Sequence, residues 1–411
     1  MAFLLFFRNF ADHKDMNQAT RQFIHDHAEA DVHQLALRGT KDPDVDLTFA
    51  LEQIAGRQRA MTKLPTWAAI EGITFPPHLA MEQCSSEQAA RYKAKVIEKS
   101  LQKHQYFVDL TGGFGVDFSF IAPLFDKAVY VEQQSQLCAI SLKNFKLLGI
   151  VSDVVNADGI EVLHTLSHVD MVFMDPARRD EHGARTYGLA DCTPNVLAHI
   201  DELMEKTDNL MLKLSPMLDW WKTVDDIQQT GSAKVNVVHL VSVDNECKEL
   251  LLQISKTETP LQVCCVNNDN LFEFFVTETT RMPPSSLEHP VYLYEPNASV
   301  MKAGCFDLLA ERFGVCQLAR NSHLFVSDTV VKEFPGRQFC IERVSSMNKR
   351  DLKVSLQGID KANITVRNFP LSVSDLRKRL KLKDGGDVFI FATTLANRDH
   401  KLLICRKTSY V

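Results

Sequence analysis

Four acidic residues stand directly after four apolar segments in the first half of the chain: Asp109, Glu132, Asp158 and Asp175. A glycine-rich turn, Gly112-Gly-Phe-Gly115, follows the first acid and leads into a helical pattern. Such glycines let the backbone pass close to a nucleotide-like ligand without Cβ collisions. Glu132 stands where a second parallel strand would end, and its carboxylate can accept both hydroxyls of a ribose. The two features together indicate an adenosine-containing cofactor.

The glycine turn also indicates which cofactor. A dinucleotide-binding loop reads G-x-G-x-x-G, but Phe118 stands at the place of its third glycine. The segment from Asp109 to Gly115 instead resembles the D-x-G-x-G-x-G loop of class I S-adenosylmethionine (SAM) methyltransferases, with Thr111 replacing the first glycine. An ordinary strand–turn–helix remains the alternative. The residues expected at the cofactor are Asp109, Thr111, Gly113, Gly115, Asp117, Glu132, Asp158 and Gly159. The Asp158-Gly159 pair is also typical of a plain turn.

A third apolar segment ends in Asp175-Pro-Ala-Arg-Arg-Asp180. In amine methyltransferases this position reads [D/N]-P-P-[Y/F], and the acid or amide and the next carbonyl hold an exocyclic NH2. Asp175 and Pro176 keep that pattern, whereas Ala177 and Arg178 remove the aromatic residue that would stack on a base. Arg178 could stack through its guanidinium plane or grip a phosphate. The expected catalytic residues are therefore Asp175, Pro176 and Arg178; a surface loop after a buried strand is the alternative.

Alternating strands and helices must position these residues. Strands are expected at 107–110, 128–131, 152–156, 171–174 and 209–214, with helices between them. This pattern predicts an α/β fold, a Rossmann-like parallel sheet whose ligands bind beyond the carboxyl ends of the strands. All four acids fall at such ends. Lys213 and Ser215 stand at the end of the fifth strand, which would place one of them near the same site. A purely structural role for both is the alternative.

Four domains are expected along the chain. Helical spacing without strand alternation predicts an N-terminal helical domain over 1–80. Ser85 and Gln88 have the form of a capping box at the helix before the first strand. The methyltransferase domain is expected over 81–280 and includes two hairpins, the second across Asn267–Asn270. A ferredoxin-like segment over 281–319 and a C-terminal α+β domain over 320–411 would follow.

Charge is distributed unevenly along the chain. From 291 to 411 there are 20 Lys and Arg against 12 Asp and Glu, although the whole chain carries −6, so the first 290 residues carry −14. A basic module on an acidic body is typical of a protein that binds phosphates; a solvated helix face is the alternative. The residues expected to bind RNA are Arg367, Arg377, Lys378, Arg379 and Lys381.

Composition excludes several classes of protein. Hydrophobic and charged contents of 45% and 24% are those of a globular domain. No apolar run approaches the roughly 20 residues of a membrane helix, and the apolar start of the chain lacks a signal peptide's basic flank. Ten cysteines without a C-x-x-C pair indicate neither a zinc site nor a disulfide framework. We expect a cytoplasmic protein without membrane or metal partners.

Nearly everything after about residue 80 resembles bacterial class I methyltransferases that carry a ferredoxin-like segment and a C-terminal THUMP-like domain. The segments that carry the resemblance are 109–117, 174–179, 213–216, 319–324, 364–370 and 376–382, with Gly385 and Gly386. THUMP domains bind RNA and deliver it to an attached modifying domain. The resemblance therefore implies SAM-dependent methylation of tRNA or rRNA.

The acceptor suggested by Asp175 and Pro176 is a nucleobase amine. No cysteine stands where a covalent nucleophile for 5-methylpyrimidine formation is expected, and Cys192 is distant along the loop. Two rival functions remain open. The chain could methylate a small molecule or a protein, or it could be a non-catalytic RNA-binding protein with a vestigial SAM pocket.

Overall fold

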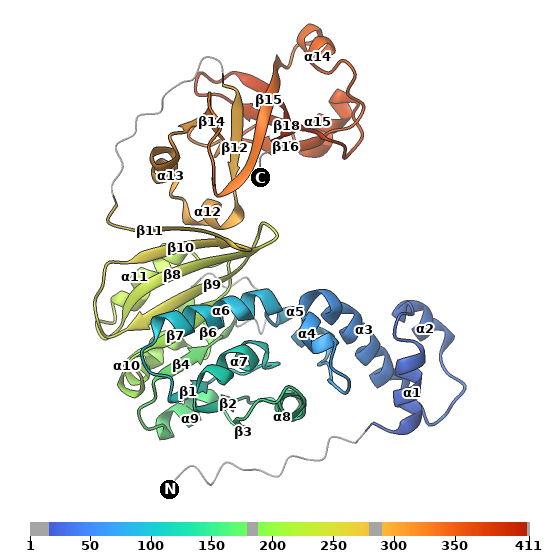
Figure 1. The fold of residues 1–411 in the computed structure, drawn as a ribbon, viewed down its shortest axis with the longest axis vertical. Helices are drawn as coiled ribbons and strands as arrows, with labels where there is room; N and C mark the ends of the chain where they lie inside the picture. The colour runs from blue at the N-terminus through green and yellow to red at the C-terminus, as the bar shows by residue number, and fades with distance from the viewer. Residues whose placement is uncertain (1–15, 179–187, 279–289, 409–411) are drawn as a thin grey trace. The chain divides into compact units, whose positions relative to one another are not determined.

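The computed structural model describes residues 16–178, 188–278 and 290–408 of the chain. These residues belong to two compact units, one formed by 1–238 with 249–259 and the other by 239–248 with 260–411 (Figure 1). Each unit has its own hydrophobic cores and is described by itself. The first residues of the predicted ferredoxin-like segment, 281–289, lie outside the described residues, as do Arg179 and Asp180.

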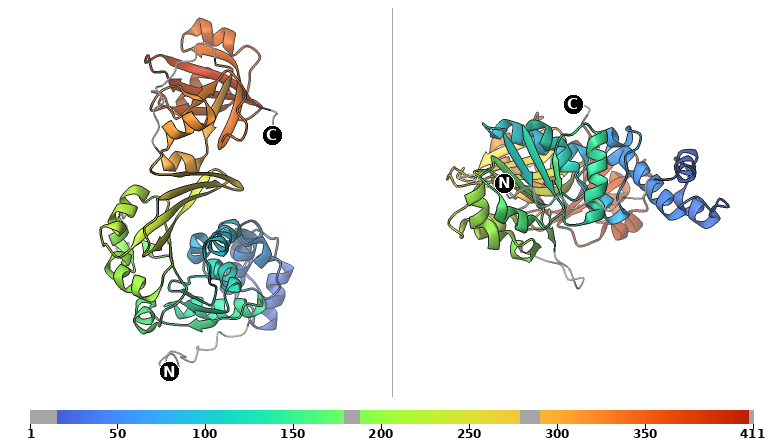
Figure 2. Two further views of the ribbon diagram at one scale, coloured as in Figure 1. Left: turned by 60° about the vertical axis from the view of Figure 1, so that its left-hand side comes forward. Right: turned by 90° about the horizontal axis from the view of Figure 1, so that it is seen from below.

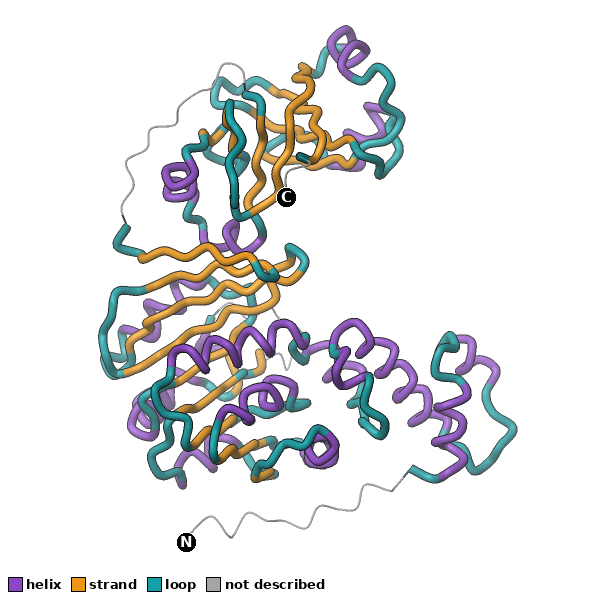
Figure 3. The backbone as a smooth tube through the Cα atoms, viewed as in Figure 1, coloured by secondary structure: helices purple, strands orange, loops and turns teal. Residues whose placement is uncertain are grey.

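Helices make up the described chain before the first strand, as the periodicity predicts (Figure 3). The side chains of Asn17, Asp31 and Asp46 each accept a backbone N–H three residues on, which caps the first three helices. The helices are α1 (Gln18–Asp26), α2 (Val32–Arg38), α3 (Leu47–Lys63), α4 (Pro65–Ala68), α5 (His78–Gln83) and α6 (Glu87–Ser100).

The predicted parallel sheet is present in the first unit. Its parallel strands are β1 (Tyr106–Asp109), β2 (Lys127–Val131), β3 (Asp153–Val155), β4 (Met171–Met174) and β7 (Leu210–Leu214). Strand β9 (Glu246–Ser255) runs antiparallel to β7, so that the order within this unit is β9-β7-β4-β1-β2-β3. The strands are apolar almost throughout because both faces of the sheet are covered by helices. Their carboxyl ends bring the acids of the predicted site to one edge.

Two layers of helices cover this sheet (Figure 2). Ile97 of α6 packs with Phe118 and Phe145 against Phe107 and Tyr130 of the strands, so α6, α7 and α8 share one core. The first layer also includes α7 (Val116–Ile121), the 3-10 turn η2 (Ala122–Leu124) and α8 (Ser135–Leu147). The second comprises α9 (Gly159–Thr165), α10 (Val196–Lys206) and α11 (Trp220–Gln228).

Shorter elements lie between β4 and α10, where β5 (Ala177–Arg178) pairs with β6 (Cys192–Thr193). The 3-10 turn η3 (Leu189–Asp191) precedes β6. Cys192 therefore lies opposite Arg178, close in space to the Asp175-Pro176 motif despite its distance along the chain. The Cys192 side chain is buried.

The two predicted hairpins follow α11. Strand β8 (Lys234–Val243) leads through Asp244 and Asn245, with φ of 50° and 62°, into β9, and such a pair of positive φ angles is what a type I′ turn requires. In the second unit, β10 (Gln262–Asn267) pairs with β11 (Asn270–Phe275) across the predicted turn. Strand β11 ends at Phe275, where the backbone turns.

The C-terminal part of the second unit is a seven-stranded sheet of order β13-β14-β12-β15-β18-β17-β16. All its pairs are antiparallel except β16 with β17. The strands are β12 (Tyr292–Pro296), β13 (Cys316–Gln317), β14 (Phe325–Ser327), β15 (Gly336–Ser346), β16 (Asn363–Arg367), β17 (Val388–Thr394) and β18 (His400–Lys407). The helices are α12 (Ala298–Ala303), α13 (Phe306–Phe313), α14 (Lys349–Ser355) and α15 (Val373–Leu380).

Candidate functional site

The turn after β1 packs too tightly for any residue except glycine at two of its positions. A Cβ on Gly112 would lie 2.2 Å from the ring of Tyr130, and one on Gly115 would lie 2.6 Å from the ring of Phe145. Gly113 and Gly115 also have positive φ, 57° and 81°. The turn is therefore packed against Tyr130 of β2 and Phe145 of α8, with its backbone close to the carboxyl ends of β1 and β2.

Glu132 follows β2 and is tied to this turn. Its Oε2 accepts the backbone N–H of Gly113 at 2.8 Å, and its Oε1 accepts that of Gln134 at 2.7 Å. Burial is the main cause that raises the pKa of Glu132, and the backbone N–H groups oppose it. Each carboxylate oxygen can accept more than one hydrogen bond, so Glu132 keeps capacity for the hydroxyls of a ribose.

Thr111 links the end of β1 to the end of β4. The carboxylate of Asp109 accepts the backbone N–H of Thr111 at 2.9 Å, and the Thr111 hydroxyl accepts the backbone N–H of Asp175 at 2.6 Å. Thr111 thus fills the first glycine position of the loop with a side chain that holds the backbone of the Asp175-Pro176 motif. Burial, followed by the charges of Asp117, Asp175 and Glu132, raises the pKa of Asp109 well above its usual range.

Asp158 and Gly159 do not form a plain turn, because they begin α9. The Asp158 side chain accepts the backbone N–H groups of Ile160 and Glu161 and caps the helix. A Cβ on Gly159 would lie 2.1 Å from the backbone oxygen of Leu110. The pair therefore seats the N-terminus of α9 against the chain that follows β1. A contact from Asp158 to adenine stays a prediction.

Replacing Gly159 by alanine tests this close approach. We expect a loss of about 1–3 kcal/mol in the free energy of unfolding, because a backbone oxygen must move to admit the methyl group. Gly188→Ala is the matched control, since its Cβ would meet nothing nearer than 3.5 Å. Urea unfolding followed by tryptophan fluorescence measures both variants, and equal stabilities would contradict the packing of this helix.

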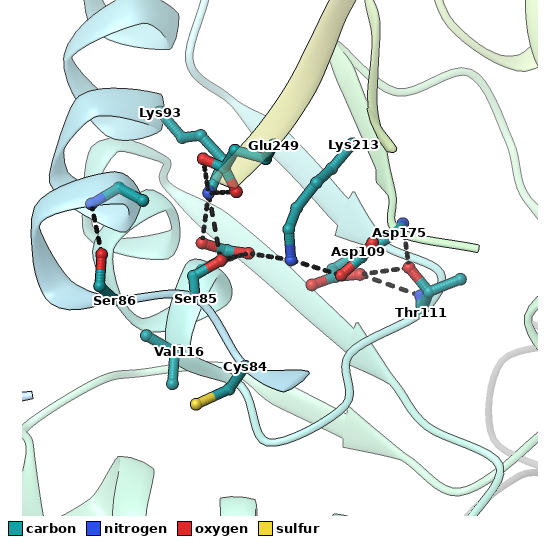
Figure 4. A network of polar contacts seen from close by, with 12 residues as sticks. Cys84, Ser85, Ser86, Lys93, Asp109, Thr111, Val116, Asp175, Lys213 and Glu249 are labelled. Carbon is teal, nitrogen blue, oxygen red and sulfur yellow. Dashed lines mark hydrogen bonds and ion pairs between the residues drawn. The ribbon is translucent and has the colours of Figure 1, made fainter. Parts of the chain in front are cut away.

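A buried chain of alternating charges continues from Asp175 (Figure 4). Lys213, at the end of β7, places its Nζ 2.5 Å from Asp175 Oδ2 and 3.4 Å from Asp117 Oδ2. Asp117 pairs next with Lys93 of α6 at 3.0 Å, and Lys93 contacts both carboxylate oxygens of Glu249 of β9 at 2.6 and 2.7 Å. Asp117, expected at the cofactor, is thus the centre of an ion-pair network.

The opposite charges of this network shift the pKa values of their neighbours in favour of the ionised forms. Burial raises the pKa of Asp117, but the ammonium groups of Lys93 and Lys213 and the hydroxyl of Ser85 outweigh burial, so the pKa lies below its usual range. Burial lowers the pKa of Lys213, but the carboxylates of Asp175, Asp117 and Glu249 raise it well above the ordinary value. Lys213 is therefore a cation at neutral pH.

Lys93 and Glu249 were not among the residues expected at the site, and Ser85, expected to cap the helix before β1, does not cap it. Ser86, not Ser85, caps α6 by accepting the backbone N–H of Ala89. Ser85 instead donates to Asp117 Oδ2 at 2.7 Å. One feature of the sequence could have indicated that Lys93 is buried. It stands on the apolar face of its helix, with Ala89, Ala90 and Ile97 among the other buried residues.

The motif after β4 is described up to Ala177 in full. Asp175 is partly exposed and Pro176 is buried. Arg178 ends β5, and its side chain lies outside what the structure describes. Its expected role in stacking or phosphate binding therefore stays a prediction.

The five residues expected to bind RNA fall into two groups. Arg367 pairs with Glu295 at 2.8 Å, and Arg377 donates to the backbone oxygens of Ala362 and Lys383 and to Asp384. These two side chains hold parts of their own unit together. Lys378, Arg379 and Lys381, at the end of α15, are exposed.

Comparison with known proteins agrees with this architecture. Family models match a ferredoxin-like domain at residues 292–335 and a THUMP domain-like region at 336–407. A crystal structure of a candidate methyltransferase from Porphyromonas gingivalis W83 matches with a TM-score of 0.82 and 29% identity, covering 98% of this chain and 100% of that one. The chain combines a class I methyltransferase fold with ferredoxin-like and THUMP-like domains.

Further solved structures match only part of this chain. A candidate RNA methyltransferase from Pyrococcus horikoshii has 14% identity and a TM-score of 0.36, over 49% of this chain and 96% of that one. An rRNA methylase from Streptococcus thermophilus has 15% identity and a TM-score of 0.31, over 41% and 96%. No curated protein sequence matches the chain.

The THUMP-like region comprises β15 to β18 with α14 and α15, and the ferredoxin-like region comprises β12 to β14 with α12 and α13. The two regions share one sheet through the pairing of β12 with β15. The domain limits of the sequence analysis, 281–319 and 320–411, stay predictions beside these matched ranges.

The described residues offer neither a membrane-spanning helix nor a cluster of metal ligands. None of their helices is both long and apolar enough to cross a bilayer. They also hold no group of three or more His, Cys, Asp or Glu side chains arranged to bind a metal ion.

Proposed function

We propose that this protein transfers the methyl group of SAM to an amine on a nucleobase of tRNA or rRNA. The observation that carries the proposal is the place of Asp175, at the carboxyl end of β4 with its backbone N–H tied to Thr111 of the glycine loop. The candidate methyltransferase from P. gingivalis and the THUMP domain-like match support the reaction class and the substrate class.

The residues at this edge of the sheet fit SAM. The glycine turn passes close to Glu132, whose carboxylate suits a ribose, as expected for the nucleoside part. Apart from Asp109, whose pKa lies well above its usual range, the described side chains of the site include four carboxyl groups, those of Asp117, Glu132, Asp175 and Glu249, against the two ammonium groups of Lys93 and Lys213. An excess of negative charge at the site favours a cationic ligand. When bound, SAM supplies a methyl group on a positively charged sulfonium.

The chain's own residues would position the acceptor. The Asp175 carboxylate and the Pro176 backbone oxygen accept N–H bonds from the amine and turn its lone pair towards the methyl group. Holding the two reacting atoms in line at near-attack distance accounts for much of the rate of such a reaction. A base within a helix would first have to leave its stack.

Incubation of the full-length protein with radiolabelled SAM and total RNA from a deletion strain tests this function. Mass spectrometry of the digested RNA would identify an N-methylated nucleoside that the parent strain contains and the deletion strain lacks. Label in protein or small molecules alone would favour the first rival function. Failure of SAM to bind in calorimetry would favour the vestigial pocket.

The exposed end of α15 is the expected RNA contact. We expect the triple charge reversal of Lys378, Arg379 and Lys381 to glutamate to lower RNA affinity and to reduce the slope of log K against log salt by about 2–3, because about three phosphate contacts are lost. Filter binding between 50 and 300 mM salt, roughly the range where counterion release dominates, measures this. SAM affinity should not change.

The matched control reverses three exposed lysines elsewhere, Lys41, Lys99 and Lys146. It changes the net charge by the same amount. If both triple variants bind RNA equally well, the interface does not include the end of α15.

A further inference from the structure

The Asp175–Lys213 ion pair joins the acceptor motif to the buried network. We propose that Lys213 is a positioning residue that makes a carboxylate obligatory at position 175, where related amine methyltransferases carry either Asp or Asn. This inference rests on the proposed transfer to an amine. Lys213 would act through Asp175, by taking one carboxylate oxygen and leaving the other for the N–H of the acceptor.

The geometry around Asp175 fixes which oxygen Lys213 takes. Lys213 Nζ donates to Oδ2 at 2.5 Å, and the Thr111 hydroxyl holds the backbone N–H of the same residue. The Lys213 side chain is 10% exposed, whereas that of Asp175 is 37% exposed. One end of the carboxylate thus faces the protein interior while the residue as a whole remains accessible.

Lys213 has little freedom to move away from Asp175. Its Nζ also lies 3.4 Å from Asp117, which Lys93 and Ser85 hold in place. The neighbouring carboxylates raise its pKa well above the ordinary value despite burial, so it donates hydrogen bonds and does not act as a base. Leaving a buried ammonium group without a hydrogen-bond acceptor costs free energy. Lys213 will therefore keep its hydrogen bond to an oxygen of residue 175, whichever side chain supplies that oxygen.

An amide at position 175 offers a single oxygen. In an Asp175→Asn variant, Lys213 would take that oxygen, because an ammonium group can only donate. The Asn NH2 group would then face the acceptor amine, and two donors cannot bond to each other. Without a lysine at 213 the amide is free to rotate, and its oxygen could accept from the amine. Lys213 therefore determines whether an amide at position 175 can accept a hydrogen bond from the acceptor amine.

Four proteins test this dependence: the wild type, D175N, K213M and the double variant D175N/K213M. We expect D175N to lose about a hundredfold or more in kcat, as for other single groups that align a reacting atom. K213M should lose about tenfold, because Asp175 is less well placed. The double variant should be at least about tenfold more active than D175N, since its amide can rotate. SAM affinity by calorimetry should stay within about threefold in all four.

D175N/K213R is the matched control. Arginine restores a donor that claims the amide oxygen, so this variant should remain as inactive as D175N. A double variant D175N/K213M no more active than D175N, with an active wild type, would overturn the inference and leave the proposed function standing. Wild-type protein that transfers no methyl group to any RNA would reject both.

Discussion

Asp175→Ala is expected to lower kcat for RNA methylation by at least about 10² to 10³, the range found when one group that stabilises or aligns a transition state is removed. SAM should still bind, because the glycine turn and Glu132 are held by contacts that do not involve the Asp175 side chain. The effect should therefore fall on kcat and leave SAM affinity within about threefold.

Asp208→Ala is the matched control for this prediction. Asp208 is an exposed acid just before β7, at the opposite end of the strand from Lys213, and it pairs with Lys256 and His168. The control should retain full turnover. Single-turnover assays together with calorimetry separate chemistry from binding, and an Asp175→Ala variant with unchanged turnover would remove Asp175 from the mechanism.

Lys93→Met is expected to cause the largest loss of stability, about 3–5 kcal/mol in the free energy of unfolding. Lys93 is fully buried and stands between Asp117 and Glu249, so its removal leaves two buried carboxylates with less compensating charge. The three tryptophans all lie in the first unit, in α4 and α11, and urea unfolding followed by their fluorescence reports on this unit.

Lys222→Met is the control for a surface pair. Lys222 contacts Asp226 but is 63% exposed, and exposed ion pairs contribute little to stability. Adding Glu249→Met to Lys93→Met should recover part of the loss, because buried pairs are often replaced by apolar residues at small cost. Equal stabilities of Lys93→Met and Lys222→Met would show that the network does not hold the fold.

The difference between the wild type and Lys93→Met should depend on pH. The folded-state pKa of Asp117 is lowered, so its ionised form stabilises the fold above the unfolded value of about 3.9. That contribution is lost as the pH falls through the folded pKa. The stability difference should therefore be constant near neutral pH and shrink below about pH 4, as the Asp117 carboxylate becomes protonated. A difference that stays constant in acid would mean that packing, not charge, sets it.

Local patterns in the sequence determined the strands, the glycine turn and the position of the acids at strand ends. A strand of four or five apolar residues, a turn and a helix are specified by neighbours within about 20 residues. Hydrophobic periodicity along the sequence therefore predicts them. The acids Asp109, Glu132 and Asp175 lie at the carboxyl ends of adjacent strands for that reason. The resemblance to THUMP-like domains was also predicted from the sequence, because short local segments such as 364–370 and 376–382 carry it.

Only the tertiary structure decided what these acids touch. Lys93 and Glu249 are 156 residues apart, and no pattern along the chain pairs a helix residue with a strand residue at that distance. Asp117, expected at the cofactor, became the centre of that network, and Arg367 and Arg377, expected at RNA, acquired partners within their own unit.

The physical reason is a difference in repetition. Burial requires an apolar residue at every turn of a helix and at every second residue of a strand, so the pattern repeats along the sequence. A buried charge needs only one partner of opposite charge, and the fold can bring that partner from any part of the chain.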